Sequence, residues 1–517
     1  MNSANDIIFT IDLIFIEAKL DGECISYLNT VRSAYEQIDE YNKEQVIQHY
    51  LTNQPPIDNL YTLYFFLFDL TNTHEFLQKI INSCPSSLSP QCFYEIYWNI
   101  GNRLFTSTKP VNITPLRDIF KKLSSELNDW LTLYKYKNKK NIKHVKNIAL
   151  LSPQILGMRH SPTREAFNIA CHLETYHDCN VTIINSNGFN YHNTLGLINP
   201  IIFNVNTDLN GTSNVNVNYM QFKNKKIKVI SIEKQMMSSR KILDILDIIK
   251  SLDTDAVISH GENLLVQDAI FGVYPSIFAT TGGVVPYAHC DSYFVPGSLF
   301  DNNHRELASK YEHNDFMLEN MLVTPEGKAD IPASKEKLGL DNNSFIYLVV
   351  STRMDREVNP EFVDICNCLI KSNKNAHIIF SGTDSFSLSS HFDAELIDRK
   401  KVINIGFQDD LASVCLMADV YLNPKRIGGG TSSQTAIING LPVVTLNYGH
   451  ISNIVPEERK FSNWKEYMQY AIELQNDNFL QSETNLFSTH FHANMNSQLQ
   501  IEKIYNKLCD IAIRKYS

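Results

Sequence analysis

The stretch ADVYLNPKRIGGGTSSQTAIINGLPVVTL, residues 418–446, decides how the rest of the chain is interpreted. It opens with a short apolar run that ends at Asn423, which predicts a buried strand. Three glycines, Gly428 to Gly430, lead into an expected short helix that ends near Gly440, and a second apolar run follows. The stretch therefore predicts a strand–helix–strand unit with a glycine loop before the helix.

This glycine loop has the chemistry of an anion site. Glycines let a ligand approach the backbone, hydroxyl groups supply donors, and a helix N-terminus offers unpaired N–H groups at its positive end. The alternative is that the glycines only turn the chain and that Ser433 only caps the helix, but three glycines and three hydroxyl residues exceed that need. The loop is neither a Walker A motif nor a GxGxxG fingerprint, because the glycines are adjacent and no Gly-Lys-Ser/Thr occurs.

Length and composition are those of an ordinary globular protein. The chain has 517 residues, enough for two or three domains, with 43% hydrophobic and 20% charged residues. A formal net charge of −10 argues against a general attraction to nucleic acid or anionic membranes. The apolar run at 7–16 contains Asp12 and is too short to span a bilayer. We therefore expect a cytoplasmic protein with no transmembrane segment and no nucleic-acid partner.

The ten cysteines form no metal-binding or disulfide pattern. They are scattered along the chain, with no CxxC pair and no histidines at matching spacing. We expect neither a zinc site nor a disulfide framework from them.

Residues 1–142 predict an all-α domain. Apolar residues recur there at helical spacing, in segments separated by proline-containing breaks. The aromatic residues crowded into 61–68 are more often the core of a helix bundle than a binding face. The lysine-rich run at 135–146 is most simply a solvated linker at the end of this domain.

Residues 143–329 predict a first doubly wound domain. Apolar strands are expected at 148–151, 181–184, 227–232 and 256–259, alternating with helices. Such alternation over some 180 residues is typical of a parallel sheet with helices on both faces.

Three polar loops should meet at one edge of that sheet, since the carboxyl ends of parallel strands share an edge. The first loop offers His160, the second His260 and Glu262, and the third His289. Each loop can also be explained as a glycine turn with a helix cap. We favour a ligand-facing role for the first two.

Residues 330–490 predict a second doubly wound domain, and 491–517 a terminal helix with one apolar face. Strands are expected at 345–350, 377–380 and 402–405, ahead of the glycine loop. A loop with two arginines follows the first of these strands.

The motifs of this second domain resemble the donor-site signature of the GT-B glycosyltransferases. The matching segments are NIGFQ at 404–408, Asp-Leu at 410–411, Ala-Asp-Val at 418–420, the glycine loop and Gly-Leu-Pro-Val-Val at 440–444. The resemblance implies an α/β protein with two Rossmann-like doubly wound domains, the acceptor side in the first and a nucleotide-sugar donor in the second. It also implies that the all-α domain recognises the acceptor.

The resemblance further implies how the donor is held. The base lies beside the backbone of the NIGFQ segment, and the diphosphate lies against the glycine loop with an arginine as counter-ion. Transfer expels a nucleoside diphosphate, so N–H groups, hydroxyls and a guanidinium can stabilise the leaving oxygen without a metal. The alternative for the arginines is a surface salt bridge with Asp355 or Glu357. The donor-site residues so implied are Arg353, Arg356, Gly406, Phe407, Gln408, Gly429, Gly430, Thr431, Ser432, Ser433 and Thr435.

This chain lacks two glutamates that are common in the family, and their absence indicates which members it resembles more. Many retaining members carry two glutamates flanking this loop, where this chain has Ile427 and Thr435. The Gly-Thr-Ser-Ser run looks more like the O-GlcNAc transferase type and the bacterial adhesin N-glucosyltransferases, which also have a helical domain ahead of the two sheets. Those enzymes usually place an aspartate for the ribose where Thr435 stands, so Gln434 or Thr435 is the expected substitute.

An inverting transferase also needs a base for the acceptor proton. His160 is the first candidate and Glu262 the second, because an imidazole can accept a proton at neutral pH. A structural role is the alternative for a single loop histidine. The resemblance, together with these residues, thus implies metal-independent transfer from a UDP-sugar to a protein or glycan acceptor, without a cofactor. The rival hypotheses are a capsule or lipid-glycan transferase and a non-catalytic GT-B partner that stabilises another transferase.

Overall fold

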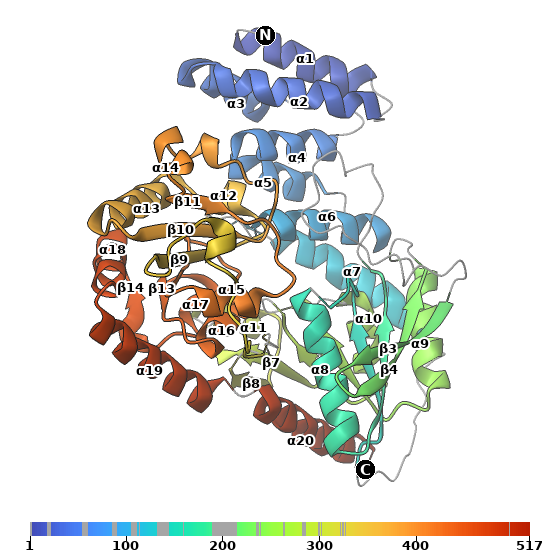
Figure 1. Ribbon diagram of the computed structural model, residues 1–517. Helices are drawn as coiled ribbons and strands as arrows, with labels where there is room; N and C mark the ends of the chain where they lie inside the picture. The colour runs from blue at the N-terminus through green and yellow to red at the C-terminus, as the bar shows by residue number, and fades with distance from the viewer. Residues whose placement is uncertain are drawn as a thin grey trace.

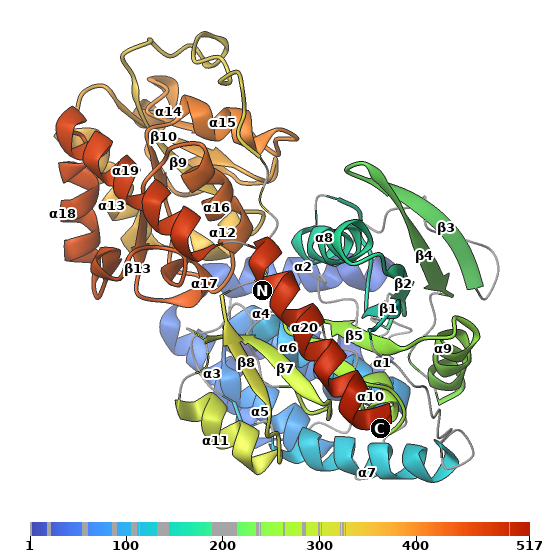
Figure 2. The ribbon, with the colours of Figure 1, turned by 90° about the horizontal axis from the view of Figure 1, so that it is seen from below.

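The computed structural model has two β-sheets covered by helices, preceded by a run of helices (Figure 1). Figure 2 separates the two sheet-containing units, which lie side by side. The residues that the structure describes are 3–17, 22–53, 60–84, 90–104, 111–112, 114–131, 144–158, 160–188, 215–233, 237, 239–261, 264–281, 286–297, 300, 302–320, 322, 325, 327–495 and 497–516.

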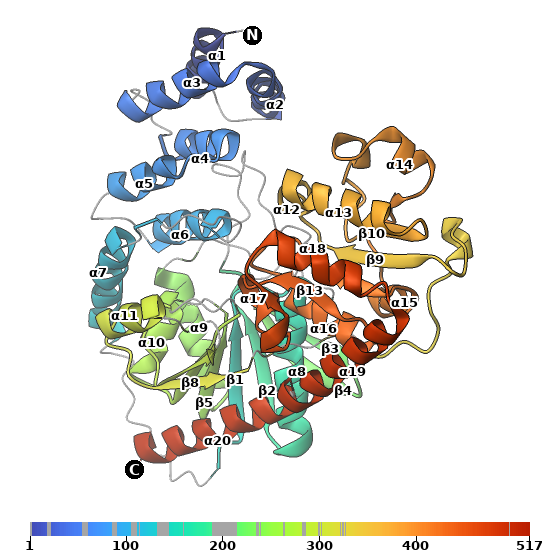
Figure 3. The ribbon, with the colours of Figure 1, turned by 90° about the vertical axis from the view of Figure 1, so that its left-hand side faces the viewer.

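The N-terminal helices stack in tiers that end on the first sheet (Figures 1 and 3). Their aromatic residues fill the core as expected, since Tyr64, Phe65 and Phe66 are buried. In the described part of the chain, no helix combines the length and apolar character needed to cross a bilayer. These helices are α1 (Ala4–Glu17), α2 (Gly22–Gln37), α3 (Glu40–Thr52), α4 (Leu60–Thr71), α5 (His74–Ser83), α6 (Pro90–Leu104) and α7 (Thr114–Leu131).

The first sheet has eight strands in the order β3-β4-β2-β1-β5-β6-β7-β8. All neighbouring strands are parallel except β3, which pairs antiparallel with β4 at one edge. The strands are β1 (Asn147–Ser152), β2 (Asn180–Asn185), β3 (Val215–Phe222), β4 (Lys225–Ile232), β5 (Ala256–His260), β6 (Ser276–Ala279), β7 (Ser292–Pro296) and β8 (Phe316–Glu319).

The two faces of this sheet bury different partners. Alternate residues of a strand point to opposite faces, so Ala149 and Leu151 join the core of the N-terminal helices, whereas Ile148 and Leu150 pack with α8 and α20. The N-terminal helices therefore share one hydrophobic core with the sheet. The domain limits at residues 142, 329 and 490 stay predictions. The helices of this part are α8 (Ser161–Tyr176), α9 (Ser239–Ser251), α10 (Leu264–Phe271), α11 (Asn302–Lys310) and the C-terminal α20 (Ser497–Tyr516).

The second sheet has six strands in the order β11-β10-β9-β12-β13-β14, all parallel. Helices α13 and α18 cover one face, and α15, α16 and α19 cover the other. The strands are β9 (Phe345–Val350), β10 (Ala376–Ser381), β11 (Val402–Asn404), β12 (Val420–Leu422), β13 (Val443–Leu446) and β14 (Lys460–Phe461). The helices are α12 (Met354–Glu357), α13 (Pro360–Ser372), α14 (Ala394–Asp398), α15 (Leu411–Met417), α16 (Gly430–Ile438), α17 (Gly449–Ser452), α18 (Trp464–Glu473) and α19 (Asp477–Asn494), with 3₁₀ turns at Glu336–Leu338, Leu388–Ser390 and Glu457–Arg459.

Among the parallel strands, the direction of chain progression reverses once within each sheet. In the first sheet the reversal lies between β1 and β5, and in the second it lies between β9 and β12. We call these two places switch points. Doubly wound sheets bind their ligands at the carboxyl ends of the strands at such points. The candidate site is therefore built from the loops that follow these four strands.

Candidate functional site

The glycine loop leaves the N-terminus of α16 open. Gly429 is the N-cap residue, with φ of 96°, and it has no side chain with which to cap the helix. Ser432 Oγ donates to Gly429 O at 3.0 Å, and Ser433 Oγ donates to Gly430 O at 2.9 Å. Because these hydroxyls donate to carbonyl groups, they do not satisfy the backbone N–H groups of the first turn. Those N–H groups suit an anion.

Ser433 and Thr435 lie inside the molecule rather than on the open side of the loop. Both are buried, and the Thr435 hydroxyl donates to Thr431 O at 3.0 Å. Thr431 and Ser432 are only half-buried. Of the loop hydroxyls, these two are therefore the better placed to meet a ligand.

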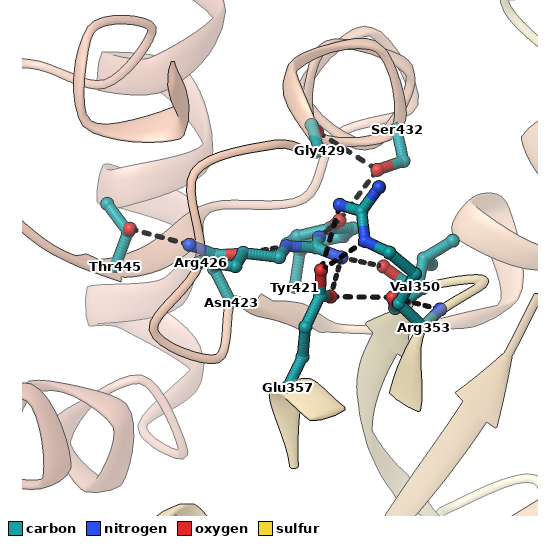
Figure 4. Close-up of polar contacts among 10 residues, drawn as sticks. Val350, Arg353, Glu357, Tyr421, Asn423, Arg426, Gly429, Ser432 and Thr445 are labelled. Carbon is teal, nitrogen blue, oxygen red and sulfur yellow. Dashed lines mark hydrogen bonds and ion pairs between the residues drawn. The ribbon is translucent and has the colours of Figure 1, made fainter. Parts of the chain in front are cut away.

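A buried arginine that sequence reasoning did not single out supports the loop from below (Figure 4). The Arg426 side chain is 4% exposed. Its Nε donates to Asn423 Oδ1 at 2.7 Å, its Nη1 to Val350 O at 2.7 Å and to Glu357 Oε2 at 3.0 Å, and its Nη2 to Tyr421 OH at 2.8 Å. The buried charge is thus paired and hydrogen bonded, as a guanidinium inside a protein must be.

The loop glycine is required by this arginine. A Cβ built on Gly429 would lie 2.5 Å from Arg426 Nη2, which is closer than atoms can approach. The positive φ at Gly429 also disfavours any side chain. The middle glycine of the run therefore lets the backbone pass directly over the guanidinium.

Glu357 joins the two arginines of the second switch point. Its carboxylate accepts from Arg353 Nε at 2.9 Å, from Ser351 Oγ at 2.6 Å and from Arg426. Burial disfavours the charge, but Arg426 and Arg353 outweigh that effect and lower the pKa of the Glu357 carboxyl. Arg353 thus makes one of the salt bridges considered from the sequence, but with a buried carboxylate, and its side chain remains 20% exposed.

A directed chain of hydrogen bonds connects Arg426 to the loop. The Tyr421 oxygen accepts from Arg426, and Ser432 donates to Gly429 O. The Tyr421 hydroxyl, 2.8 Å from Ser432 Oγ, therefore donates to it. This chain fixes the first turn of α16 relative to β12.

Arg356 lies toward the N-terminal helices. It is exposed on α12 and is close to the ion pair of Asp69 and Arg103, whose charged atoms are 2.8 Å apart. Burial raises the pKa of Asp69, and Arg103 and Arg356 partly oppose that rise. The structure thus brings Arg353, but not Arg356, into the network beneath the glycine loop.

The NIGFQ segment forms a tight turn at the carboxyl end of β11. Gly406, at φ of 66°, donates its N–H to Asn404 Oδ1 at 3.0 Å and accepts from Gly382 N at 2.8 Å. The Gln408 side chain donates to the backbone of the same turn at 2.5 Å. Phe407 is 40% exposed, which is unusual for a phenylalanine.

At the first switch point, two histidines and a buried glutamate come together. His160 is the N-cap residue of α8, and its Nδ1 lies 2.9 Å from Thr163 Oγ1. Ser161 Oγ donates to Glu165 Oε1 at 2.8 Å, and Glu165 Oε2 lies 3.4 Å from His260 Nε2. Burial, with a smaller effect from His260, lowers the pKa of His160 to about 4. Its imidazole is therefore neutral at pH 7.

The structure places only some of the residues predicted at the first switch point. His160 and His260 are brought together, whereas Glu262 lies outside the residues that the structure describes. Glu165 was not predicted, because it stands within a helix rather than in a loop. Within the described part of the chain, His260 Nδ1 and Thr280 Oγ1 are buried without a hydrogen-bond partner.

The two switch points touch. Ser161 Oγ at the N-terminus of α8 and Thr431 Oγ1 at the N-terminus of α16 lie 2.5 Å apart. Since Ser161 already donates to Glu165, the Thr431 hydroxyl donates to Ser161. Two helix N-termini from different sheets therefore face each other across one hydrogen bond.

Comparison with solved structures identifies this arrangement. The chain matches the crystal structure of a glycosyltransferase from Rickettsia africae ESF-5 with a TM-score of 0.50 and 13% sequence identity, over 71% of this chain and 98% of that chain. The chain has the GT-B fold. No family model matches the sequence, and no curated protein matches it.

Two further GT-B structures are similar over long stretches. A mutant O-GlcNAc transferase from Thermobaculum terrenum matches with a TM-score of 0.48 and 12% identity, over 99% of both chains. The pneumococcal O-GlcNAc transferase GtfA, solved with UDP and GlcNAc, matches with a TM-score of 0.47 and 11% identity, over 71% of this chain and 99% of that one. At these identities the likeness concerns the fold.

Proposed function

We propose that this GT-B chain is a glycosyltransferase that takes its sugar from a UDP-sugar. The observation that carries the proposal is the open N-terminus of α16, which is supported by the Arg426 network and meets α8 through Thr431 and Ser161. Such a site suits the diphosphate of the donor, and its place between the two sheets lets a second substrate approach from the α8 side.

The diphosphate is held by the first turn of α16. Backbone N–H groups of Gly430, Thr431 and Ser432 supply donors, and the helix dipole favours negative charge. The phosphate oxygen replaces Ser161 Oγ as the acceptor of the Thr431 hydroxyl. These donors are fixed before the reaction, so they stabilise charge that develops on the leaving oxygen without reorganisation. Arg353 adds positive charge at the edge of the network, and no metal ion is required.

The base is held at the end of β11. Phe407, which is 40% exposed, is the proposed stacking partner of the base, and the turn around Gly406 and Gln408 presents backbone groups beside it. A nucleotide lying from this turn to α16 would follow the carboxyl edge of the second sheet.

His160 is the proposed base on the acceptor side. A pKa of about 4 keeps its imidazole neutral and able to accept a proton, although it makes the free group a weak base. A bound diphosphate nearby brings negative charge, which favours the protonated imidazole and raises that pKa. His160 therefore becomes a better base when the donor is bound.

The acceptor is proposed to be a protein. The N-terminal helices share their core with the first sheet, and the Asp69 and Arg103 pair brings them close to α12 beside the donor site. A segment bound along these helices would reach the first switch point.

The test uses the purified chain with a panel of nucleotide sugars. We expect UDP to raise the thermal unfolding midpoint, and UDP release to increase when a peptide acceptor is present. UDP stabilisation with no turnover on any peptide or glycan would favour a non-catalytic partner. No stabilisation by any nucleotide would refute the proposed donor site.

A further inference from the structure

A group of metal-ligating side chains lies away from the donor site, where the C-terminal helix crosses α8. His172 is on α8, His177 directly follows that helix, and Glu502 is on α20. His172 Nε2 lies 2.7 Å from Glu502 Oε1, and His177 Nε2 lies 2.9 Å from Glu502 Oε2. Two imidazole nitrogens thus converge on one carboxylate.

The three residues offer ligand atoms to a common point. One ligand atom from each lies within 4.8 Å of the other two. Within the described residues, this is the one group of three histidine, cysteine or acidic side chains that converges in this way. Imidazole nitrogen and carboxylate oxygen are ligands of zinc and of the neighbouring first-row metals.

His177 faces the same carboxylate as His172. Its Nε2 is buried and pairs with Glu502 Oε2 at 2.9 Å. A cation bound between the two imidazole nitrogens and the carboxylate would be a common partner for all three groups.

The rings that carry these nitrogens are held in place. The His177 ring lies against Tyr505 of α20, with centroids 3.9 Å apart, and the His172 ring lies against Tyr176, with centroids 4.7 Å apart. The His172 side chain is 7% exposed, the His177 side chain 16% and the Glu502 side chain 36%. The two histidine rings are thus packed against tyrosines, whereas the carboxylate is reachable from solvent. A water molecule can therefore approach as a further ligand.

We propose that His172, His177 and Glu502 bind a divalent transition-metal ion, with Zn²⁺ as the expected occupant. Three protein ligands leave the fourth position of a tetrahedral ion for water. The cysteine and histidine spacing in the sequence predicts no zinc site, because the third ligand comes from the far end of the chain. The proposal is independent of the proposed transferase activity.

The ion would fasten a helix that passes from one sheet to the other. Helix α19 packs on the second sheet, and α20 then crosses to the face of the first sheet that carries α8 (Figure 3). A metal shared by α8 and α20 holds the end of the chain on the first sheet. Its binding therefore stabilises the folded chain, because the unfolded chain does not bring these ligands together.

The experiment measures metal binding to the full chain after removal of ions with EDTA. Titration with Zn²⁺ should show one saturable site per chain, and Co²⁺ should give the absorption spectrum of a four-coordinate ion. We expect His177→Gln and Glu502→Gln each to weaken Zn²⁺ binding by about 100-fold or more. His492→Gln, at an exposed histidine of α19, should bind Zn²⁺ like the unaltered chain.

Folding and metal binding are separated by a second measurement. Thermal unfolding in EDTA reports whether each variant folds, and unfolding with Zn²⁺ reports the stabilisation by the ion. The proposal requires a Zn²⁺-dependent rise in midpoint that is lost in folded His177→Gln and kept in His492→Gln. It is overturned if the unaltered chain shows no saturable site, or if His177→Gln binds Zn²⁺ as tightly as the unaltered chain.

Discussion

The two switch points of this molecule differ in how completely their polar groups are paired. Under the glycine loop, Arg426 and Glu357 are joined to each other and to neighbouring groups by a closed set of hydrogen bonds. On the α8 side, by contrast, His260 has a buried ring nitrogen without a partner among the described residues, and His160 has a strongly lowered pKa. The second sheet thus offers a rigid anion platform, whereas the first holds groups whose protonation can change. This division suits a reaction in which one side binds the leaving group and the other moves a proton.

The largest effect is expected from Arg426→Ala. The substitution leaves the Glu357 carboxylate buried with Arg353 as its remaining cation, so the free energy of unfolding should fall by about 3–5 kcal/mol. Urea unfolding measures the loss. Arg399→Ala is the matched control, because its pair with Glu395 is largely exposed and should contribute less than about 1 kcal/mol. Equal losses for the two substitutions would contradict the claim that the buried Arg426 network stabilises the fold more than an exposed ion pair does.

The pH dependence of stability should distinguish the two switch points. The folded pKa of His160, about 4, lies below its ordinary value of about 6.5, so the unfolded chain binds the proton more tightly. The free energy of unfolding should therefore fall by up to roughly 3 kcal/mol as the pH falls from about 6.5 to about 4, because the unfolded chain takes up this proton first. The free energy of unfolding of His160→Gln should therefore fall less over this pH range than that of the unaltered chain. Parallel pH curves for the two proteins would contradict the account.

Gly429→Ala should have an intermediate effect. The positive φ and the short distance from a new Cβ to Arg426 Nη2 should lower the free energy of unfolding by about 1–3 kcal/mol. Gly101→Ala in α6 is the control, because a Cβ there meets nothing within 4 Å. That control should leave stability unchanged or slightly raised. Thermal unfolding of both variants checks the difference.

The smallest effect concerns the contact between the switch points. Thr431→Ala removes the neutral hydrogen bond to Ser161, worth about 1 kcal/mol, and Ser161→Ala removes that bond together with the one that Ser161 donates to Glu165. If the contact is direct, the double variant should lose less stability than the sum of the single variants. Thr431→Ala should also weaken UDP binding, whereas Ser161→Ala should not, because only Thr431 is proposed to touch the diphosphate. Strict additivity would mean that the two helix ends do not interact in solution.

Much of the fold could be predicted because buried parallel strands are continuous apolar runs. The strand expected at 345–350 is β9, and the unit at 418–446 contains β12, α16 and β13 in the expected order. Strand β3 escaped prediction because asparagines alternate with its apolar residues and the strand lies exposed at an edge.

The residues that complete the site are those whose role depends on distant contacts. Arg426 stands next to the exposed Lys425, and no local pattern distinguishes the buried cation from the exposed one. Its partner Glu357 comes from another strand end, and Glu165 meets His260 only when β1 and β5 pair. Glycines and hydroxyls could be predicted, because they reflect local backbone chemistry. The charges beneath them could not.

The most direct test of the central claim is a crystal structure of the chain with UDP. The account predicts diphosphate oxygens within hydrogen-bond distance of the backbone N–H groups at 430–432, with the Thr431 hydroxyl turned from Ser161 to a phosphate. The base should lie beside Phe407. UDP bound away from the N-terminus of α16, or no bound UDP at saturating concentration, would contradict it.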